Sequence, residues 1–178
     1  RIADKREFAG YWEYLLDEAL FTTPAHPEWS GAALLDGAGR LIGIGSLLTQ
    51  ESAEGETTQG NMSVPIDLLE PILASMIETG QSGRAARPWL GMYVAESEGQ
   101  LTVGGVTQGG PAERAGVRTD DMVLEVAGER VTTLGDFLRA VWRIGPAGVS
   151  VPIMLARGAE LVRLTLRSVD RNDMLSRP

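Results

Sequence analysis

Gly109-Gly110-Pro111-Ala112-Glu113-Arg114-Ala115-Gly116-Val117 is the stretch of the 178-residue chain that decides the fold of its second half. Proline suits the first turn of a helix because its missing N–H has no intrahelical partner there, and glycine accepts the left-handed conformation that ends a helix. The stretch therefore predicts a short helix over residues 111–115. The apolar segment 122–126 predicts a β-strand, and Ala127-Gly128 predicts a tight turn into residues 130–131.

A longer helix and two strands are predicted after this hairpin. Thr133 and Asp136 have the spacing of a helix cap, in which the threonine side chain accepts a hydrogen bond from the first turn. Residues at helical spacing form an apolar stripe: Leu134, Phe137, Leu138, Val141 and Trp142. Apolar residues then alternate over 149–155 and 162–166, which predicts two strands joined by a turn at 157–160.

Two further strands are expected before the short helix, over residues 90–95 and 101–107. The complete order is strand, strand, short helix, hairpin, helix, strand, strand. This order resembles that of the PDZ domains attached to bacterial proteases. Three segments carry the resemblance: Arg87-Pro88-Trp89-Leu90-Gly91-Met92, the stretch quoted above, and Asp120-Asp121-Met122-Val123-Leu124-Glu125-Val126-Ala127-Gly128.

The PDZ resemblance implies that an extended peptide adds as a strand to a sheet edge, which would be residues 92–95, opposite the helix 134–142. It also places the terminal carboxylate of an apolar peptide C-terminus at the backbone N–H groups of Leu90, Gly91 and Met92. This needs Gly91 to adopt a turn that a Cβ would block. The implied peptide-binding residues are Trp89, Leu90, Gly91, Met92, Tyr93, Val94, Leu134, Phe137, Leu138 and Val141.

Several of these residues have a second interpretation. Leu90, Met92, Phe137 and Val141 are also the residue types of an ordinary core, and Gly91 could be a plain turn glycine. Arg87 could be a solvated linker charge instead of a partner for a carboxylate. The residue types alone leave both interpretations open.

The first half of the chain is also rich in predicted strands. Residues 8–20 are interpreted as one strand because aromatic and aliphatic residues fill their middle. Asp36-Gly37-Ala38-Gly39 predicts a hairpin between strands at 32–35 and 40–48. The acidic segment 51–60 predicts an exposed loop, and residues 62–66 predict another short strand.

A helix is predicted over residues 67–79, with Asp67 as its cap and Gly80 as its stop. Its apolar face would consist of Leu69, Ile72, Leu73, Met76 and Ile77. Glycine, serine, glutamine, alanine and arginine without apolar periodicity then indicate a linker. The expected organisation is a first domain over 1–80, a linker over 81–87, the PDZ domain over 88–170 and a frayed polar tail over 171–178.

The segment from Trp29-Ser30-Gly31-Ala32-Ala33-Leu34-Leu35 to Ile44, and then Asn61-Met62-Ser63-Val64-Pro65-Ile66-Asp67, resembles the HtrA (Deg) branch of the trypsin-like serine proteases. The resemblance runs from about Glu13 to Gly80. The implied fold is mostly β: the second barrel of a chymotrypsin-fold protease followed by a PDZ domain, a partly open barrel with two helices. Because the chain begins at Arg1, we expect it to be part of a longer protein whose first barrel precedes it.

The protease resemblance implies a set of site residues. Ser30 would be the nucleophile, and the backbone N–H groups of Glu28 and Ser30 would form the oxyanion hole. The catalytic His and Asp would come from the first barrel, so this chain alone is expected to be inactive. The lone His26 is interpreted as a loop residue and not as the general base. The specificity pocket would be walled by Ile44, Gly45 and Ser46.

The segment departs from the family at four positions, and these keep an inactive scaffold open as an alternative. Glu28 replaces a glycine, Trp29 replaces a small polar residue, and Ala32-Ala33 replace Gly-Pro. The loop over residues 17–30 is also longer. The alternative is a pseudo-protease whose PDZ domain binds protein partners. A third possibility is that only the PDZ part functions, as a regulatory module released by cleavage.

Composition excludes other classes of function. The net charge of -8 comes from 16 basic and 24 acidic residues, and such an acidic surface disfavours nucleic acid. Apolar runs are far shorter than the roughly 20 residues that span a bilayer. The absence of cysteine and the single histidine make a metal site improbable, and no cofactor is expected.

The expected partners are therefore polypeptides. By resemblance, the intact protein would cleave misfolded or exposed chains in the periplasm or outside the cell, as part of protein quality control. It would assemble as a homotrimer. We also expect exposed apolar surface around the aromatic residues between Tyr11 and Tyr14, which would favour self-association of the isolated chain.

Overall fold

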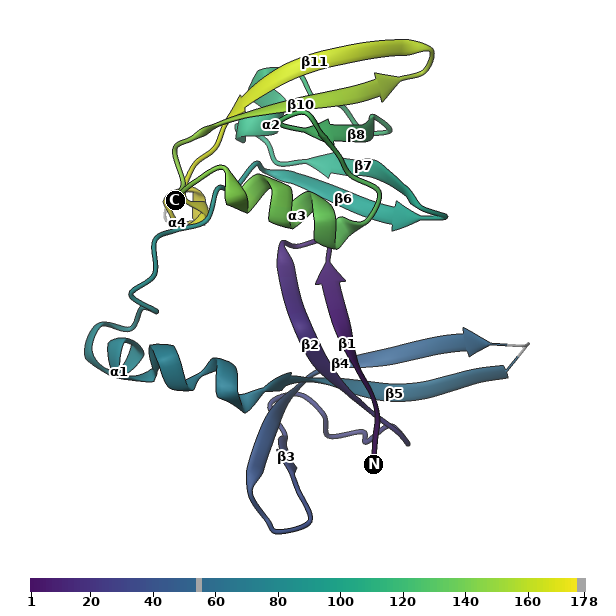
Figure 1. The fold of residues 1–178 in the computed structure, drawn as a ribbon, viewed down its shortest axis with the longest axis vertical. Helices are drawn as coiled ribbons and strands as arrows, with labels where there is room; N and C mark the ends of the chain where they lie inside the picture. Colours follow the sequence, from purple (N-terminus) through teal and green to yellow (C-terminus); the bar gives the residue numbers. More distant parts are fainter. Residues whose placement is uncertain (54–55, 176–178) are drawn as a thin grey trace. The chain divides into compact units, whose positions relative to one another are not determined.

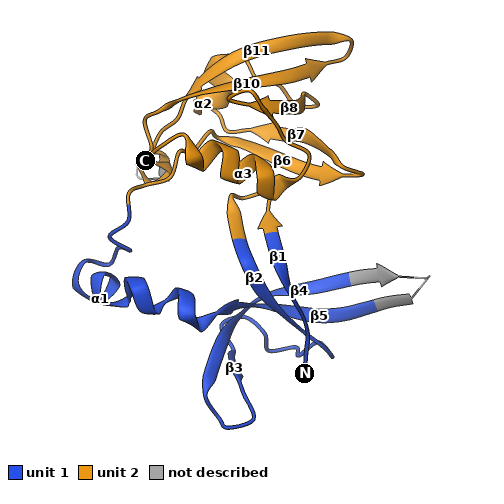
Figure 2. Ribbon diagram, viewed as in Figure 1, with its two compact units in different colours: residues 1–8, 16–84 blue, residues 9–15, 85–178 orange. Residues whose placement is uncertain are grey.

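The computed structural model describes residues 1–53 and 56–175, and the chain divides into two compact units. The first unit comprises residues 1–8 and 16–84, and the second comprises residues 9–15 and 85–178 (Figure 2). The change from one unit to the other after residue 84 lies in the segment whose composition is typical of a linker. Nothing in the sequence pattern separates residues 9–15 from the residues on either side.

The first unit is built on one antiparallel sheet with the strand order β1-β2-β5-β4-β3. The strands are β1 (Ile2–Gly10), β2 (Tyr14–Thr22), β3 (Ala33–Leu35), β4 (Leu41–Ala53) and β5 (Glu56–Pro65) (Figure 1). Leu20 of β2 lies opposite Ser63 of β5, and Ile44 of β4 lies opposite Val64. The buried apolar residues of this unit are few: Leu16, Ala19, Leu20, Phe21 and Met62.

Two predictions for this half are wrong. Residues 8–20 are not one strand, because the backbone N–H of Glu13 bonds to the carbonyl of Gly10 and turns the chain between β1 and β2. Residues 51–60 are not an exposed loop as a whole, since Glu51 pairs with Thr58 in the β4–β5 ladder. Backbone hydrogen bonds extend a two-stranded ribbon even where side chains are polar. Residues 54–55 of the predicted loop lie outside the described residues.

The predicted helix is present, but it begins later than expected. A 3-10 turn, η1 (Ile66–Leu68), precedes α1 (Glu70–Thr79), and no side chain caps α1, so the capping role of Asp67 is wrong. Pro71 stands in the first turn, where its missing N–H costs little. Gly80 ends the helix with φ 72°, as predicted. No residue of α1 is buried, and Ile77 is 77% exposed.

The second unit is a twisted sheet with helices, and the predicted order of elements is confirmed. Its strands are β6 (Met92–Ser97), β7 (Gln100–Val106), β8 (Met122–Val126), β9 (Glu129–Arg130), β10 (Ser150–Arg157) and β11 (Glu160–Arg167), in the order β11-β10-β8-β7-β6, with β9 paired to β8 (Figure 1). Its helices are α2 (Pro111–Ala115), α3 (Leu134–Arg143) and α4 (Arg171–Leu175). The tail was predicted to be frayed, but residues 171–175 are helical.

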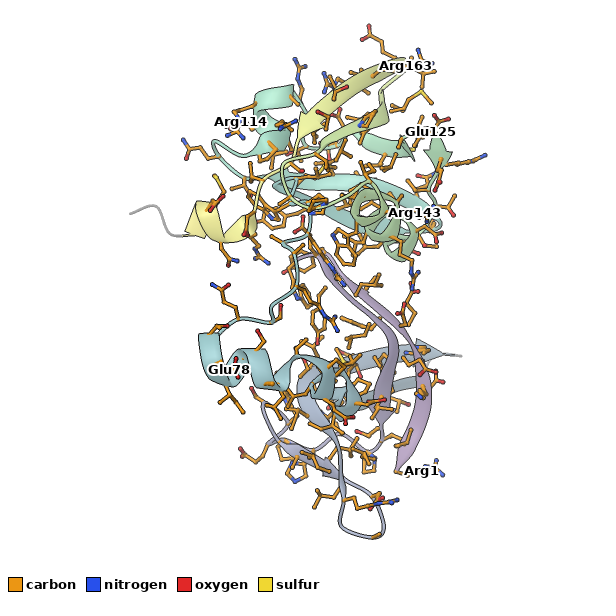
Figure 3. The ribbon with its side chains drawn as sticks, turned by 60° about the vertical axis from the view of Figure 1, so that its left-hand side comes forward. Arg1, Glu78, Arg114, Glu125, Arg143 and Arg163 are labelled. Carbon is orange, nitrogen blue, oxygen red and sulfur yellow. The ribbon has the colours of Figure 1, made fainter. Side chains whose placement is uncertain are left out.

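The alternating residues of β10 give this strand one buried face. Val151, Ile153 and Leu155 are buried, whereas Pro152 between them is exposed. Helix α3 begins as predicted, because the Thr133 side chain accepts a hydrogen bond from the Asp136 N–H across 3.1 Å. Charged side chains such as Arg163 project from the surface of this unit (Figure 3).

A buried ion pair fixes the start of β8. The Asp121 side chain is 1% exposed, and the Arg157 guanidinium donates to both of its oxygens at 2.7 Å. The backbone N–H of Arg118 donates to the same carboxylate at 2.8 Å, and Arg157 also donates to the Gly116 carbonyl. These hydrogen bonds hold the pKa of Asp121 below its ordinary value, the Arg157 contact being the largest cause. The pair thus joins the end of α2 to the end of β10.

Candidate functional site

Ser30 lies exposed on a tight turn that is fixed against β4. Gly31, which follows it, has φ 73°, a conformation that glycine adopts without strain. The Gly31 N–H donates to the Gly45 carbonyl at 2.9 Å, and the Gly45 N–H donates to the Ala32 carbonyl at 2.7 Å. A Cβ on Gly45 would lie only 1.9 Å from the Trp29 carbonyl oxygen. The backbone around Ser30 can therefore approach β4 this closely only because residue 45 is glycine.

The Glu28 amide, which the sequence suggests as an oxyanion donor, is engaged in this structure. Its N–H donates to Nδ1 of His26 at 3.1 Å. The His26 backbone N–H in turn donates to Oδ1 of Asn61 at 2.6 Å, so the loop is anchored to β5. The N–H of Glu28 thus points to a side chain of its own loop. His26 is a loop residue, but it organises the turn that carries Ser30.

A cavity of about 240 Å³ lies beside this turn. Residues on both sides of Ser30 line it: Thr22, His26, Glu28, Trp29, Ala32, Ala33, Leu34, Gly45, Asn61 and Ser63. Of the three predicted pocket residues, Gly45 is among them, whereas Ile44 and Ser46 are not. The sequence prediction missed the cavity residues Asn61 and Ser63 of β5, Thr22 of β2, and the segment 32–34.

Asn61 is a buried polar residue of this cavity whose hydrogen-bonding capacity is only partly used. It is 5% exposed, its Oδ1 accepts from His26, and its Nδ2 has no hydrogen-bond partner among the described residues. A buried donor without a partner costs free energy. β5 is largely polar, so its sequence carries no distinct signal for the role of Asn61.

The loop before β6 has the geometry that carboxylate capture requires. Gly91 has φ 69°, and a Cβ there would lie 3.0 Å from the Trp89 ring. The carbonyls of Leu90 and Gly91 both accept hydrogen bonds: Leu90 accepts from the Ala112 N–H and Gly91 from the Thr107 N–H, both at 2.8 Å. Hydrogen bonds from Ala112 and Thr107 therefore fix the conformation of the loop. The positive φ of Gly91 agrees with the predicted need for glycine at this position.

Among the described residues, β6 is the terminal strand of its sheet and pairs with β7 alone. A terminal strand offers unpaired backbone groups to an incoming extended peptide. Helix α3 is fixed at the far end of this strand, because the Leu134 N–H donates to Oε2 of Glu96 at 2.7 Å. Tyr93 is 42% exposed on β6 and can meet a ligand directly.

The side chains of most predicted peptide-binding residues are buried. Tyr93 is exposed, and Gly91 has no side chain. The other eight side chains are buried: Trp89, Leu90, Met92, Val94, Leu134, Phe137, Leu138 and Val141. These residues therefore support the binding edge by packing in the core and would not contact a peptide through exposed side chains. Arg87 is not a free linker charge, since its guanidinium lies 3.9 Å from the centre of the Trp142 ring.

One residue near this loop was not singled out from the sequence. Glu13 belongs to the second unit, and its carboxyl group lies near the backbone N–H of Leu90 and near Arg171. Burial raises the pKa of Glu13 to about 7, and the nearby Arg171 opposes this rise. A single glutamate in an aromatic segment carries no sequence signal for such a contact.

Two classes of feature are absent from the described part of the chain. Residues 1–53 and 56–175 contain no cluster of three His, Asp or Glu side chains that could hold a metal ion. Over the same residues no helix combines the length and the apolar character needed to cross a bilayer.

Comparison with known proteins finds similarity along most of the chain. The family model of the PDZ domain matches residues 102–157. The serine endoprotease DegS of Salmonella typhimurium is 28% identical over 142 residues, which are 72% of this chain and 39% of DegS. The serine protease Do-like HtrB of Bacillus subtilis is 27% identical over 74% of this chain and 32% of its own length.

Solved structures agree with these sequence matches. The HtrA-type protease AlgW with a decapeptide is 30% identical and has a TM-score of 0.56, over 87% of this chain and 50% of AlgW. The likeness confirms the predicted fold class, which is mostly β with a protease-type sheet followed by a PDZ domain. The chain spans 32% to 50% of the length of these relatives.

Proposed function

We propose that this chain, a relative of the HtrA-type serine proteases with a PDZ domain in its second half, forms the nucleophile-bearing and peptide-sensing part of a serine endopeptidase. The substrates of the intact protein would be misfolded or exposed polypeptides. Its PDZ domain would bind C-terminal peptides at β6 and thereby recruit substrate or regulate cleavage. A relative in Pseudomonas fluorescens carries the name probable periplasmic serine endoprotease DegP-like, which supports a periplasmic or secreted location. A homotrimer remains our expectation for the intact protein.

The observation that carries this proposal is the exposed Ser30 on a turn fixed by Gly45 and flanked by a cavity. In the proposed reaction, Ser30 Oγ attacks a peptide carbonyl and gives its proton to a histidine supplied from outside these residues. The N–H groups of Glu28 and Ser30 would stabilise the oxyanion. The same histidine then protonates the leaving amine, and water releases the acyl group from Ser30.

The cavity would serve as the primary specificity pocket. Its size suits a small or medium side chain, and its lining by Ala32, Ala33 and Trp29 favours an apolar group. Gly45 is the predicted pocket residue that contributes to it. We place Ile44 and Ser46 in supporting positions along β4.

One observation favours the alternative of a non-catalytic scaffold. The Glu28 N–H is bound to His26, so the amide must turn away from that side chain before it can hold an oxyanion. A protein that never makes this change would present its PDZ domain to partners without cleaving them.

Fluorophosphonate labelling of the intact protein, beside its Ser30→Ala variant, distinguishes the serine endopeptidase from the non-catalytic scaffold. Labelling that disappears in the variant would establish an activated serine. A folded protein that binds peptides but is not labelled would establish the scaffold. The 178-residue chain alone is expected to remain unlabelled, because the proposed base lies outside it and Nδ1 of its single histidine, His26, accepts a hydrogen bond from the Glu28 N–H.

A further inference from the structure

One wall of the cavity beside Ser30 carries two polar residues of β5. Asn61 and Ser63 both line the cavity, whereas Met62 between them does not. Alternate residues of a strand share a face, so the side chains of Asn61 and Ser63 lie on the cavity side of β5. Asn61 is 5% exposed and Ser63 is 4% exposed, so both polar groups are largely removed from solvent.

The orientation of the Asn61 amide is set by the backbone of His26. The His26 N–H can only donate, and it donates to Oδ1 of Asn61 at 2.6 Å. The amide oxygen must therefore face His26, and Nδ2 must take the opposite position. Nδ2 is buried and has no hydrogen-bond partner within residues 1–53 and 56–175. The donor half of this side chain is thus unused.

The sheet prevents Asn61 from moving to relieve this unpaired donor. Asn61 lies in the ladders of two neighbouring strands, opposite Thr22 of β2 and Leu48 of β4. Its carbonyl also accepts from Oγ1 of Thr22 at 3.4 Å. A buried donor without a partner is unfavourable, and an acceptor that a ligand brings into the cavity would remove that cost. The amide therefore favours a ligand that carries such an acceptor.

The other groups of the cavity restrict the charge of that acceptor. Glu28 lines the same cavity, and its carboxylate disfavours a second negative charge beside it. A lysine or arginine side chain brings donors only and would leave Nδ2 of Asn61 unpaired. A neutral hydroxyl or amide oxygen is the acceptor that fits both conditions. The cavity volume of about 240 Å³ limits the ligand to a small or medium side chain.

We propose that Asn61 makes this cavity select substrates with a neutral hydrogen-bond acceptor, threonine above all, at the residue whose carbonyl Ser30 attacks. We call that residue the cleavage residue. Its methyl group would pack against the apolar wall at Trp29 and Ala33, and its hydroxyl oxygen would accept from Nδ2 of Asn61. The inference rests on the proposed endopeptidase function and names its substrate class. A pocket that hydrogen-bonds its substrate discriminates against the isostere without the polar atom, because its own buried group then stays unpaired.

Matched fluorogenic peptides test this selection on the intact protein. The peptides are identical except at the cleavage residue, which is threonine or its isostere valine in one pair, and asparagine or leucine in the other. In each pair kcat/KM should be about tenfold higher for the polar member. Peptides with aspartate or lysine there should be cleaved more slowly than the threonine peptide. Equal or faster cleavage of the valine peptide, or a preference for lysine, would overturn the assignment.

Asn61→Asp removes the donor but keeps an oxygen for the His26 N–H. This variant should lose the preference for threonine over valine, while fluorophosphonate still labels Ser30. Gln59→Glu is the matched control, because it makes the same change from amide to carboxylate at an exposed position of β5. It should keep the tenfold ratio. The same ratio in Asn61→Asp as in the original protein would show that the Asn61 amide does not contact the cleavage residue.

A second measurement needs neither cleavage nor a folded variant. In the two-dimensional amide spectrum of the 178-residue chain, the Nδ2 protons of Asn61 should shift downfield with added acetamide, whose oxygen is a small neutral acceptor. Asn172 is the other asparagine of the chain and is exposed, so its side-chain amide is the reference in the same spectrum. A shift of Asn61 no larger than that of Asn172 would overturn the inference.

The two measurements distinguish failure of this inference from failure of the proposed function. Labelling of Ser30 without a preference for threonine over valine would overturn the role of Asn61 and leave the endopeptidase function standing. If Asn61 responds to acetamide but Ser30 is never labelled, the endopeptidase function fails, and the substrate assignment fails with it.

Discussion

The backbone N–H of Glu28, two residues before Ser30, donates to Nδ1 of His26 across 3.1 Å, and this bond keeps the amide from donating to an oxyanion at Ser30. The His26 backbone is itself tied to Asn61, so removal of the imidazole alone would leave the loop attached. His26 therefore restrains one peptide plane and does not support the whole loop.

His26→Ala should raise the rate at which fluorophosphonate labels Ser30 in the intact protein. One neutral hydrogen bond contributes about 1 kcal/mol, so a rate increase of about fivefold is expected. Ser30→Ala in the same background is the control for specific labelling. A slower rate in His26→Ala would show that the imidazole supports the active arrangement.

Gly45→Ala should distort the Ser30 turn. The new Cβ would lie 1.9 Å from the Trp29 carbonyl oxygen, which is backbone and cannot rotate away. We expect loss of Ser30 labelling together with destabilisation of about 2–3 kcal/mol. Gly37→Ala is the matched control, since nothing lies within 4 Å of its Cβ position and no unusual φ is required. Normal labelling in Gly45→Ala would contradict the assigned packing.

Gly91→Ala and Gly99→Ala separate backbone strain from the shape of the carboxylate loop. The two glycines have φ 69° and 72°, so each substitution should cost about 1 kcal/mol through its backbone. Only at Gly91 does the Cβ meet the Trp89 ring, at 3.0 Å, whereas Gly99 has open space. Urea unfolding should show the larger loss for Gly91→Ala, and peptide affinity should fall in that variant alone.

Asp121→Asn should destabilise the PDZ domain by about 3 kcal/mol, because it leaves the Arg157 charge without its partner. The pKa of Asp121 is lowered in the fold, chiefly by Arg157. Its contribution is therefore present above the unfolded pKa near 4 and is lost as the pH falls through the lowered folded pKa. The difference between the two proteins in urea unfolding should be constant from about pH 5 to 8 and shrink below about pH 4.

The Arg143–Glu129 pair provides the comparison for that experiment. Its N–O distance of 2.8 Å is similar, but its side chains are 63% and 57% exposed. Glu129→Gln should cost less than about 1 kcal/mol, because solvent screens exposed pairs. Similar losses for Glu129→Gln and Asp121→Asn would show that burial is not what makes the Asp121 pair important.

Much of the PDZ half could be predicted because its signals are local. Pro111 and Gly116 delimit α2, Thr133 caps α3, and alternating residues mark β10 and β11. Each of these depends on a few neighbouring residues. The positive φ of Gly91 was also predictable, since a turn that brings amides together excludes a Cβ.

The missed features depend on contacts between distant segments. Position 13 looks like part of a strand until the turn from Gly10 is known, and its contact with Leu90 joins residues far apart in sequence. The extension of β4 and β5 through polar residues depends on backbone pairing, which side-chain character does not report. The role of Asn61 in the cavity likewise needs the register of β5.

Helix α3 is fixed beside the terminal strand at both of its ends. Glu96 holds its first turn, and Arg87 lies on Trp142 in its last turn. The strand and the helix therefore need little rearrangement to receive a peptide. The observed binding rate should then rise in proportion to peptide concentration without reaching a plateau, because no slow opening step precedes binding. Stopped-flow traces of the original chain check this, and a plateau would show that the binding edge must first open.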